Sequence, residues 1–270
     1  MPELPEVEIT RQGLLPLINQ RVKNVVIRNA SMRWPIPSHL VTTLENKALL
    51  SLKRRAKYIL AEFESGTLLL HLGMSGHISL LDRNHPPEKH DHFDLQFHNQ
   101  QVLRLTDPRR FGAVLWAGDA PQNHVLLRSL GPEPLEDLFN GAYLYQQLRR
   151  RKAPIKNTIM DAHLVVGVGN IYANESLFRA SINPQLVSNK LSLSRCEKLV
   201  SEIKATLRDA LEAGGSSLKD FAAVDGNPGY FQQSYFVYSR MEEPCKVCGT
   251  LIKSIRIGQR STFYCQACQK

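Results

Sequence analysis

The chain has 270 residues, a length that suits one large globular domain or two of ordinary size. Of these residues 43% are hydrophobic and 22% are charged, as in a globular protein. No stretch reaches the roughly 20 apolar residues of a membrane-spanning helix, and the first residues lack the basic and apolar run of a signal peptide, so we expect a cytoplasmic protein with no membrane partner. The 34 Lys and Arg against 25 Asp and Glu give a net charge of +9, which favours a nucleic acid as the partner.

The first half of the chain predicts a β-rich domain. A short amphipathic segment begins near Pro5, and after it turn sequences such as ESG at 64–66 separate the apolar runs. Strands at such short spacing, without helices between them, favour an antiparallel sandwich or barrel. The runs rich in β-branched and aliphatic residues are 22–28, 48–63, 67–74, 77–81, 92–97 and 102–107.

The pattern becomes helical after about residue 130. Two helical stretches surround VGVG at 166–169. Residues 192–215 predict a long amphipathic helix that begins with a capping box of Ser194 and Glu197 and ends at a glycine pair. The chain therefore divides into a β-rich half, a helical half and a short tail that carries cysteines.

The tail contains a four-cysteine motif. Cys245 and Cys248 form one CxxC pair, and Cys265 and Cys268 form a second. Two such pairs, separated by a segment of hairpin length, can surround a tetrahedral metal ion, and four sulfur ligands leave no open position for a substrate. We predict one structural Zn²⁺, with Arg260 near the tip of the intervening hairpin; a redox-active CxxC is the competing interpretation.

Three further motifs are compatible with a nucleic acid. GVGN at 167–170 precedes a helical stretch and resembles a phosphate-binding turn, although Asn170 can equally be a plain helix N-cap. HLGMSGH at 71–77 and TDPRRFG at 106–112 place Met and Phe near Arg in loops; such apolar side chains can unstack a DNA duplex or merely anchor the loops. Basic residues cluster at 53–57, 108–110 and 149–152, where a solvated surface is the alternative.

These segments resemble the bacterial formamidopyrimidine-DNA glycosylase family. MPELPEVE, KRRAKY, HLGMSG, TDPRRFG, VVGVGNIYANE and a cysteine tail with GQRSTFYC succeed one another in the order of that family, from Met1 to Lys270. The start and the LGMSG and DPRRFG segments are less similar to the related endonuclease VIII. The resemblance implies an α+β fold with an N-terminal β-sandwich catalytic domain (1–130), a helical helix-two-turn-helix domain with a lesion-recognition loop (131–235) and a zinc ribbon (236–270).

The resemblance also implies a bifunctional DNA glycosylase and AP lyase of base excision repair, acting on 8-oxoguanine and formamidopyrimidines in damaged double-stranded DNA. Pro2 would be the nucleophile once Met1 is removed, since more of an α-amino group than of a lysine amine is unprotonated at neutral pH. Glu3 would be the general acid at the sugar ring oxygen. Lys57 would act in β-elimination, and Arg260 would act in δ-elimination and clamp a phosphate.

The remaining site residues come from the same resemblance. Met74, Arg109 and Phe111 would fill the hole left by the extruded base and contact the opposite cytosine, and the segment 216–234 would cover the extruded base. Further DNA contacts are expected from His71, His90, Asn170 and one of Arg151 and Lys152, and lesion recognition from Glu6, Lys219 and Tyr230.

Two other functions remain open on the sequence. One is an endonuclease VIII-like glycosylase for oxidised pyrimidines, and the other is a zinc-ribbon DNA-binding protein without catalysis. No nucleotide cofactor is expected, because GVGN lacks the GK[ST] of a P-loop and does not complete GxGxxG. Nothing in the sequence indicates oligomerisation, so we expect a monomer.

Overall fold

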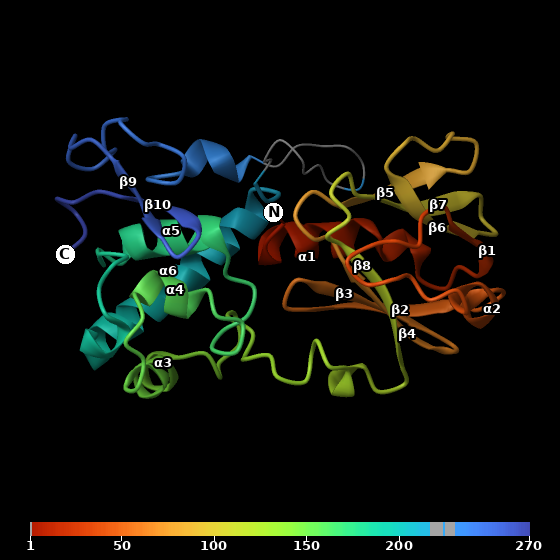
Figure 1. Ribbon diagram of the computed structural model, residues 1–270, viewed down its shortest axis with the longest axis horizontal. Coiled ribbons are helices and arrows are strands. Elements are labelled where there is room, and N and C mark those ends of the chain that lie inside the picture. Colours follow the sequence, from red (N-terminus) through yellow and green to blue (C-terminus); the bar gives the residue numbers. More distant parts are fainter. Residues whose placement is uncertain (1, 217–223, 225–229) are drawn as a thin grey trace. The chain divides into compact units, whose positions relative to one another are not determined.

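The computed structural model describes residues 2–216, 224 and 230–270, which form two compact units (Figure 1). The first unit comprises Met1–Arg128 and Ala213–Tyr230, and the second comprises Ser129–Glu212 and Phe231–Lys270. The first unit is thus built from two separate stretches of chain. Residues 213–230, which the sequence groups with the helical domain 131–235, belong instead to the β-rich unit.

Two antiparallel four-stranded sheets form the first unit. The expected run 48–63 is two strands rather than one, because Ala56 adopts a φ of +55° and turns the chain. One sheet has the order β1 (Val22–Ile27), β6 (Asp91–Phe97), β7 (Gln101–Thr106), β5 (His77–Asp82), and the other has the order β2 (Leu49–Arg55), β3 (Tyr58–Phe63), β4 (Gly66–His71), β8 (Ala113–Gly118).

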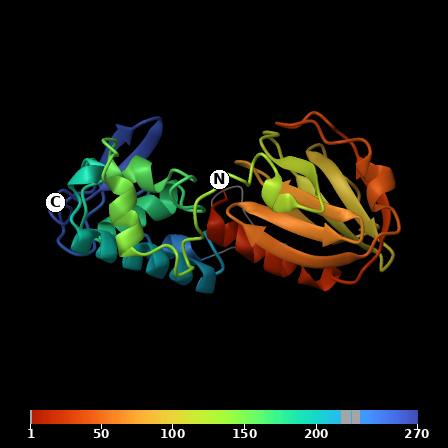
Figure 2. The ribbon, with the colours of Figure 1, turned by 90° about the horizontal axis from the view of Figure 1, so that it is seen from below.

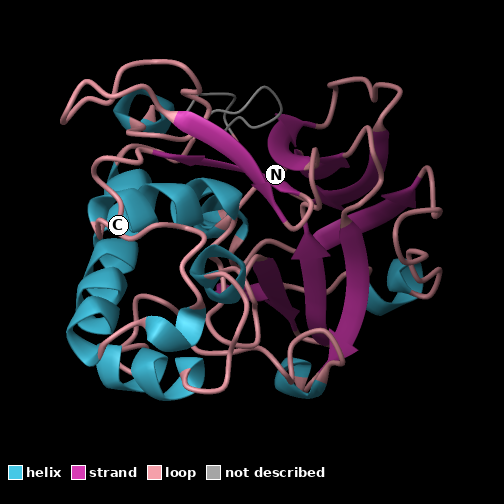
Figure 3. Ribbon diagram, turned by 60° about the vertical axis from the view of Figure 1, so that its left-hand side comes forward, coloured by secondary structure: helices cyan, strands magenta, loops and turns pink. Residues whose placement is uncertain are grey.

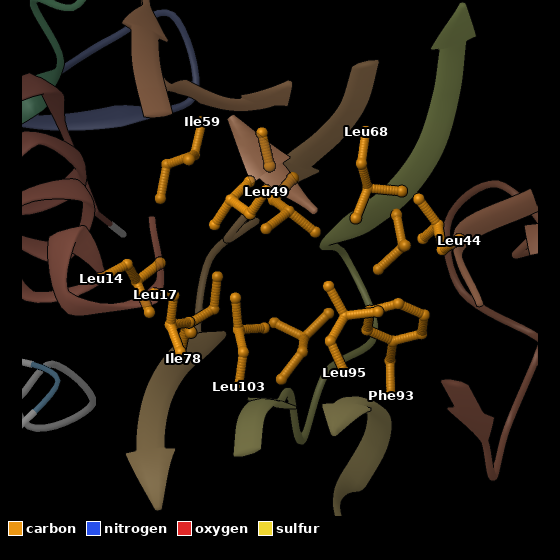
Figure 4. Close-up of a cluster of buried hydrophobic side chains, with 14 of the residues drawn as sticks. Leu14, Leu17, Leu44, Leu49, Ile59, Leu68, Ile78, Phe93, Leu95 and Leu103 are labelled. Atoms are coloured by element: carbon orange, nitrogen blue, oxygen red, sulfur yellow. The ribbon is translucent and has the colours of Figure 1, made fainter. Parts of the chain in front are cut away.

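Buried side chains of both sheets meet in one hydrophobic core, which confirms the predicted sandwich (Figure 4). Leu49, Ile59 and Leu68 come from one sheet, and Leu95 and Leu103 from the other. Each such side chain contributes roughly 1.5–3 kcal/mol through burial. Helix α1 (Leu4–Gly13) packs beside β2 and β3; the short elements η1 (Leu15–Leu17), α2 (Leu40–Leu44) and η2 (Pro121–Asn123) complete the unit (Figure 2).

The second unit is helical. The long helix α6 (Leu193–Glu212) packs against α3 (Gly141–Leu148) and α5 (Asn170–Arg179), and α4 (Ile155–Ile159) packs against α5. The two short elements are η3 (Ser188–Lys190) and η4 (Phe231–Ser234). None of the helices in the described ranges is both long and apolar enough to cross a membrane.

The start of α6 differs from the sequence prediction. The helix begins at Leu193, so Ser194 lies in its first turn and does not cap it. The hydroxyl of Ser192 instead accepts a hydrogen bond of 3.4 Å from the backbone N–H of Arg195. The predicted end is correct: the two glycines after the helix have φ values of 74° and 81°, a region that costs glycine little.

The predicted hairpin of the tail is present in the second unit as β9 (Lys253–Ile257) and β10 (Arg260–Tyr264), drawn as magenta arrows among cyan helices in Figure 3. Gly258, with a φ of +60°, forms the turn. A small core joins the ribbon to the helices: Phe178 of α5 packs with Val237, Ile252 and two of the cysteines.

Candidate functional site

The start of α1 is held by a buried carboxylate. The backbone N–H of Glu3 donates to Oε2 of Glu6 (2.8 Å), and the backbone N–H of Ser216 donates to Oε1 of the same residue (2.9 Å). Glu3 and Glu6 are each only 2% exposed. The side chain of Glu6, expected to recognise the lesion, therefore fixes the backbone next to Pro2 and the start of the segment 213–230.

Lys57 and His71 lie near each other. Lys57 belongs to the turn between β2 and β3, and Tyr58, its neighbour, pairs with His71 across β3 and β4, with ring centroids 4.8 Å apart. Burial, with the positive charges of Lys57 and Arg33, lowers the pKa of His71 from 6.5 to about 4. The imidazole is therefore neutral at pH 7.

The hydrogen bonds of His71 indicate its tautomer. Nδ1 accepts a hydrogen bond of 3.1 Å from the backbone N–H of Gly73, so in the neutral ring the proton resides on Nε2. His71 can then present one N–H donor without carrying a charge. Such a donor suits a phosphate oxygen.

Asp107 organises the two loops of the HLGMSGH and TDPRRFG motifs. Its carboxylate is fully buried and accepts from the hydroxyl of Ser75 (2.8 Å) and from the backbone N–H groups of Gly112 (2.7 Å) and Arg109 (3.3 Å). Its own backbone N–H donates to the carbonyl oxygen of His90 (3.0 Å). The residue lies within the TDPRRFG motif, but the sequence alone assigned it no role.

Met74, Arg109 and Phe111 lie on these two loops, whose backbones touch. Gly73 has a φ of +65°, and a Cβ at this position would lie 2.4 Å from the backbone of Phe111 and Gly112. The guanidinium of Arg109 lies 5.0 Å from the centre of the Phe111 ring, and the Phe111 side chain is 42% exposed. The structure thus brings the predicted insertion residues together at one surface.

The second unit holds the hairpin of Arg260 against its helices. Arg260 is exposed at the start of β10, and the next residue, Ser261, accepts through its carbonyl oxygen from Nδ2 of Asn170 (3.0 Å) and Nζ of Lys156 (3.0 Å). Asn170 is the first residue of α5 and Gly169 is its N-cap, so the N-cap interpretation of Asn170 is wrong. Lys156 was missed because a fully buried lysine is rare.

The two alternatives in the basic run 149–152 differ in their surroundings. Nη1 of Arg151 forms an ion pair of 2.6 Å with Asp161. Lys152 is exposed. The first cation is therefore partly neutralised in the folded protein, and the second is presented to solvent.

Two of the residues predicted to recognise the lesion, Lys219 and Tyr230, belong to the segment 213–230. Lys219 lies outside the described residues. Tyr230 is 59% exposed, and its backbone N–H donates to the carbonyl oxygen of Ala213 (3.0 Å). Tyr230 also forms an isolated antiparallel bridge with Ser216, so the ends of the segment are joined.

The four tail cysteines form a zinc site. Their Sγ atoms all lie within 4.8 Å of one another, with 3.9 Å between Cys245 and Cys268 and 3.5 Å between Cys248 and Cys265. Four sulfurs at the Zn–S distance of about 2.3 Å on a tetrahedron are about 3.8 Å apart, so the set fits Zn²⁺. All four positions are protein ligands, and the metal is structural.

A β-sandwich that begins with a helix, a helical unit and a four-cysteine ribbon are the parts of the zinc-ribbon DNA glycosylases, and the class is shown by comparison with known proteins. Family models match along the chain: the formamidopyrimidine-DNA glycosylase N-terminal domain at residues 1–114, the H2TH domain of the same glycosylase at 130–222, and the zinc finger found in FPG and IleRS at 242–270.

Individual relatives agree with these models. A formamidopyrimidine-DNA glycosylase of Methylobacillus flagellatus is 63% identical over 270 residues, covering 100% of this chain and 97% of that protein. The crystal structure of MutM (Fpg) from Thermus thermophilus is 34% identical with a TM-score of 0.89, covering 99% of this chain and 98% of that one. A Lactococcus lactis Fpg variant in complex with Fapy-dG-containing DNA is 32% identical with a TM-score of 0.93 and full coverage of both chains.

The chain belongs to the formamidopyrimidine-DNA glycosylase family. It is a DNA glycosylase of base excision repair, and the resemblance found in its motifs is confirmed over its whole length.

Proposed function

We propose that this enzyme excises oxidised purines, namely 8-oxoguanine and formamidopyrimidines, from double-stranded DNA and then cleaves the strand as an AP lyase, with Pro2 as nucleophile. The observation that carries the proposal is the hydrogen bond from the backbone N–H of Glu3 to the buried Glu6 carboxylate, which fixes the chain next to Pro2. The Lactococcus lactis relative that binds Fapy-dG-containing DNA supports the choice of substrate.

The reaction begins at the sugar of the damaged nucleotide. After removal of Met1, the Pro2 nitrogen forms a bond to C1′ while the bond from C1′ to the base breaks, and the proton lost from the Pro2 nitrogen goes to the departing base. Glu3 then protonates O4′ as the bond from C1′ to O4′ breaks and the ring opens. The product is a cationic iminium, because Pro2 is a secondary amine. The iminium acidifies the C2′ proton, so that β-elimination breaks the C3′–O bond and δ-elimination then breaks the C5′–O bond; water finally releases Pro2.

Other groups would hold the DNA and stabilise its deformed state. In the first unit, we assign phosphate contacts to Lys57 and neutral His71, and we assign entry into the duplex, where the base has left, to the loops of Met74, Arg109 and Phe111. In the second unit we assign phosphate contacts to Arg260, Asn170 and Lys152. Lys152 is preferred to Arg151 because Asp161 already pairs with the arginine.

Borohydride trapping tests the central step. Incubation with 8-oxoguanine-containing duplex and borohydride should give a covalent protein–DNA adduct, and Pro2→Gly should give far less. Pro87→Gly, in the exposed loop before β6, is the matched control and should trap normally. Mass spectrometry of the native N-terminus must first show that Met1 is absent.

Two outcomes would contradict the proposal. Tight binding of lesion DNA with no trapping and no strand cleavage would leave only a DNA-binding protein. Equal or faster excision of an oxidised thymine than of 8-oxoguanine opposite cytosine would show an enzyme of the oxidised-pyrimidine class.

We further place the enzyme in the cytoplasm as a monomer. Four reduced cysteines arranged for zinc suit a reducing compartment, where the thiolates are not lost to disulfides. Fractionation and size-exclusion chromatography with light scattering check the two statements.

A further inference from the structure

Strand β10, which begins with Arg260, lies along helix α5 (Figure 1). In the part of the chain that the structure describes, β10 pairs with no strand other than β9, so the backbone groups on its outer edge need other partners. Two of these groups belong to Ser261 and Phe263, which are two residues apart and therefore face the same edge. Helix α5 supplies a partner to each of them.

Two asparagines of α5 make these contacts. Nδ2 of Asn170 donates to the carbonyl oxygen of Ser261 (3.0 Å), and Oδ1 of Asn174 accepts from the backbone N–H of Phe263 (2.8 Å). Four helical residues at about 1.5 Å each span about 6 Å, and two strand residues at about 3.4 Å each span about 7 Å. Because these lengths are similar, one turn of the helix can hold two successive outward-facing residues of the strand.

The amide of Asn174 is bound through both of its polar atoms. The residue is only 1% exposed, and Nδ2 donates to the carbonyl oxygen of Asn170 in the preceding turn of α5 (2.5 Å). A backbone N–H can only donate, so the amide atom that faces Phe263 must be the oxygen. The two hydrogen bonds therefore fix the orientation of the amide and hold Phe263 against the helix.

Other contacts attach the ribbon to α5. The carboxylate of Glu175 accepts from three consecutive backbone N–H groups at 236–238, at 2.8 to 3.0 Å, and Phe178 packs in the small core with two of the zinc-binding cysteines. These contacts hold the start of the ribbon and its zinc site. Loss of the hydrogen bond at Asn174 should therefore leave the ribbon attached and its zinc bound, while β10 loses a fixed position along the helix.

We propose that Asn174 is a positioning residue for Arg260. Phe263 and Arg260 belong to the same short strand, so the hydrogen bond from Phe263 to Asn174 sets where β10 lies along α5, and with it where the guanidinium is presented. The inference rests on the proposed function, in which Arg260 acts in δ-elimination and contacts a phosphate. It assigns Asn174 to that step and not to base excision, which takes place at Pro2.

Two variants of nearly the same shape separate the hydrogen bond from packing. Asn174→Leu removes the oxygen that accepts from Phe263, whereas Asn174→Asp keeps an acceptor at that place. With 8-oxoguanine-containing duplex at saturating enzyme, we expect Asn174→Leu to raise the ratio of β- to δ-elimination product about tenfold, because about 1 Å of misplacement can cost on the order of 100-fold. Asn174→Asp should stay within about threefold of the unaltered enzyme, because the acceptor remains. Borohydride trapping and zinc content should be unchanged in both variants.

Combination with Arg260→Ala tests whether the effect passes through the arginine. Asn174→Leu should not change the product ratio further in that background, because the group that it positions is absent. Asn123→Leu, at an exposed asparagine of η2, is the matched control and should leave the product ratio of the otherwise unaltered enzyme as it is.

Several results would overturn the positioning role. They are an unchanged product ratio in Asn174→Leu, an equal rise in Asn174→Asp, and a further rise when Asn174→Leu is added to Arg260→Ala. Loss of zinc from Asn174→Leu would overturn it as well, by showing a role in the fold of the ribbon. Absence of borohydride trapping in the unaltered enzyme would instead refute the proposed function, whatever the variants show.

Discussion

The side chains of Lys156 and Thr262 are joined by a hydrogen bond of 2.6 Å, with both residues completely buried. The ammonium of Lys156 also donates to the carbonyl oxygen of Ser261 at 3.0 Å. A buried charge is tolerated only when hydrogen bonds replace its water. Lys156 therefore ties α4 to the hairpin that carries Arg260, and the position of that arginine depends on it.

We expect Lys156→Met to weaken the attachment of the hairpin. The change removes the donor from the buried hydroxyl of Thr262, at a cost of about 1–3 kcal/mol, whereas the carbonyl oxygen of Ser261 keeps its hydrogen bond from Asn170. Zinc should be retained, while DNA affinity falls and the product of β-elimination accumulates at the expense of the δ-elimination product. Gel analysis of the products and a zinc assay measure this; Lys204→Met, at a surface lysine bonded to the carbonyl oxygen of Glu136, is the control.

The carboxylate of Asp107 should be essential to the two insertion loops. In the unaltered protein both carboxylate oxygens of Asp107 accept hydrogen bonds, which come from Ser75, Arg109 and Gly112. Asp107→Asn replaces one of these oxygens with an NH₂ group, which cannot accept them. We expect the free energy of unfolding to fall by about 1–3 kcal/mol and binding to lesion DNA to weaken. Urea unfolding and fluorescence anisotropy measure the two effects. Asp119→Asn, at an exposed aspartate, should change neither the free energy of unfolding nor the binding of lesion DNA. Equal values of both quantities in the two variants would contradict the role of Asp107.

His71 should make the first unit sensitive to acid. Its pKa is about 4 when folded and 6.5 ordinarily, so between these values the unfolded chain binds more protons. Above pH 6.5 the imidazole is neutral in the folded and the unfolded chain, so its titration does not change the free energy of unfolding. As the pH drops from 6.5 to about 4, the free energy of unfolding falls by up to about 3 kcal/mol.

Removing the imidazole should flatten this dependence. We expect His71→Asn to lose less stability than the unaltered protein between about pH 7 and pH 4, measured by urea unfolding. His39→Asn, at an exposed histidine, should retain the full dependence. Identical slopes in all three proteins would show that His71 is not the titrating group.

Loss of one zinc ligand should abolish DNA binding without unfolding the first unit. Cys248→Ser removes a thiolate from the four-sulfur site, and we expect the protein to release zinc and to lose DNA binding. Near-ultraviolet circular dichroism should still report a folded first unit. If the zinc-free variant cuts DNA at the normal rate, the role assigned to Arg260 is wrong.

Features that depend on local sequence were predictable. The six predicted runs cover seven of the eight sandwich strands, five of them singly and β2 and β3 as one run, and the cysteine spacing predicted the zinc site and its hairpin. The break at Ala56 was missed, because nothing in KRRAKY signals a turn there. Strand β8 was not singled out, since its apolar run comes directly after the TDPRRFG motif without a separate turn.

Features that depend on contacts between distant residues were not predictable from one sequence. In the sequence Asp107 resembles an ordinary loop aspartate, and only the structure shows that it accepts a hydrogen bond from Ser75. In the sequence Lys156 resembles a solvated helix lysine, and only the structure shows that it is buried and bonded to the hairpin. The placement of 213–230 in the first unit depends on the packing of Val224, which sequence position alone would assign to the second half.

The discontinuity of the first unit limits how the molecule can be dissected. The chain leaves this unit after Arg128 and returns to it for Ala213–Tyr230. A fragment ending at Arg128 would lack Val224 and expose the surface around Gly13, and it would leave one oxygen of Glu6 without Ser216. A self-contained catalytic fragment would therefore need the returning segment grafted back by a linker, because no single cut separates the two units.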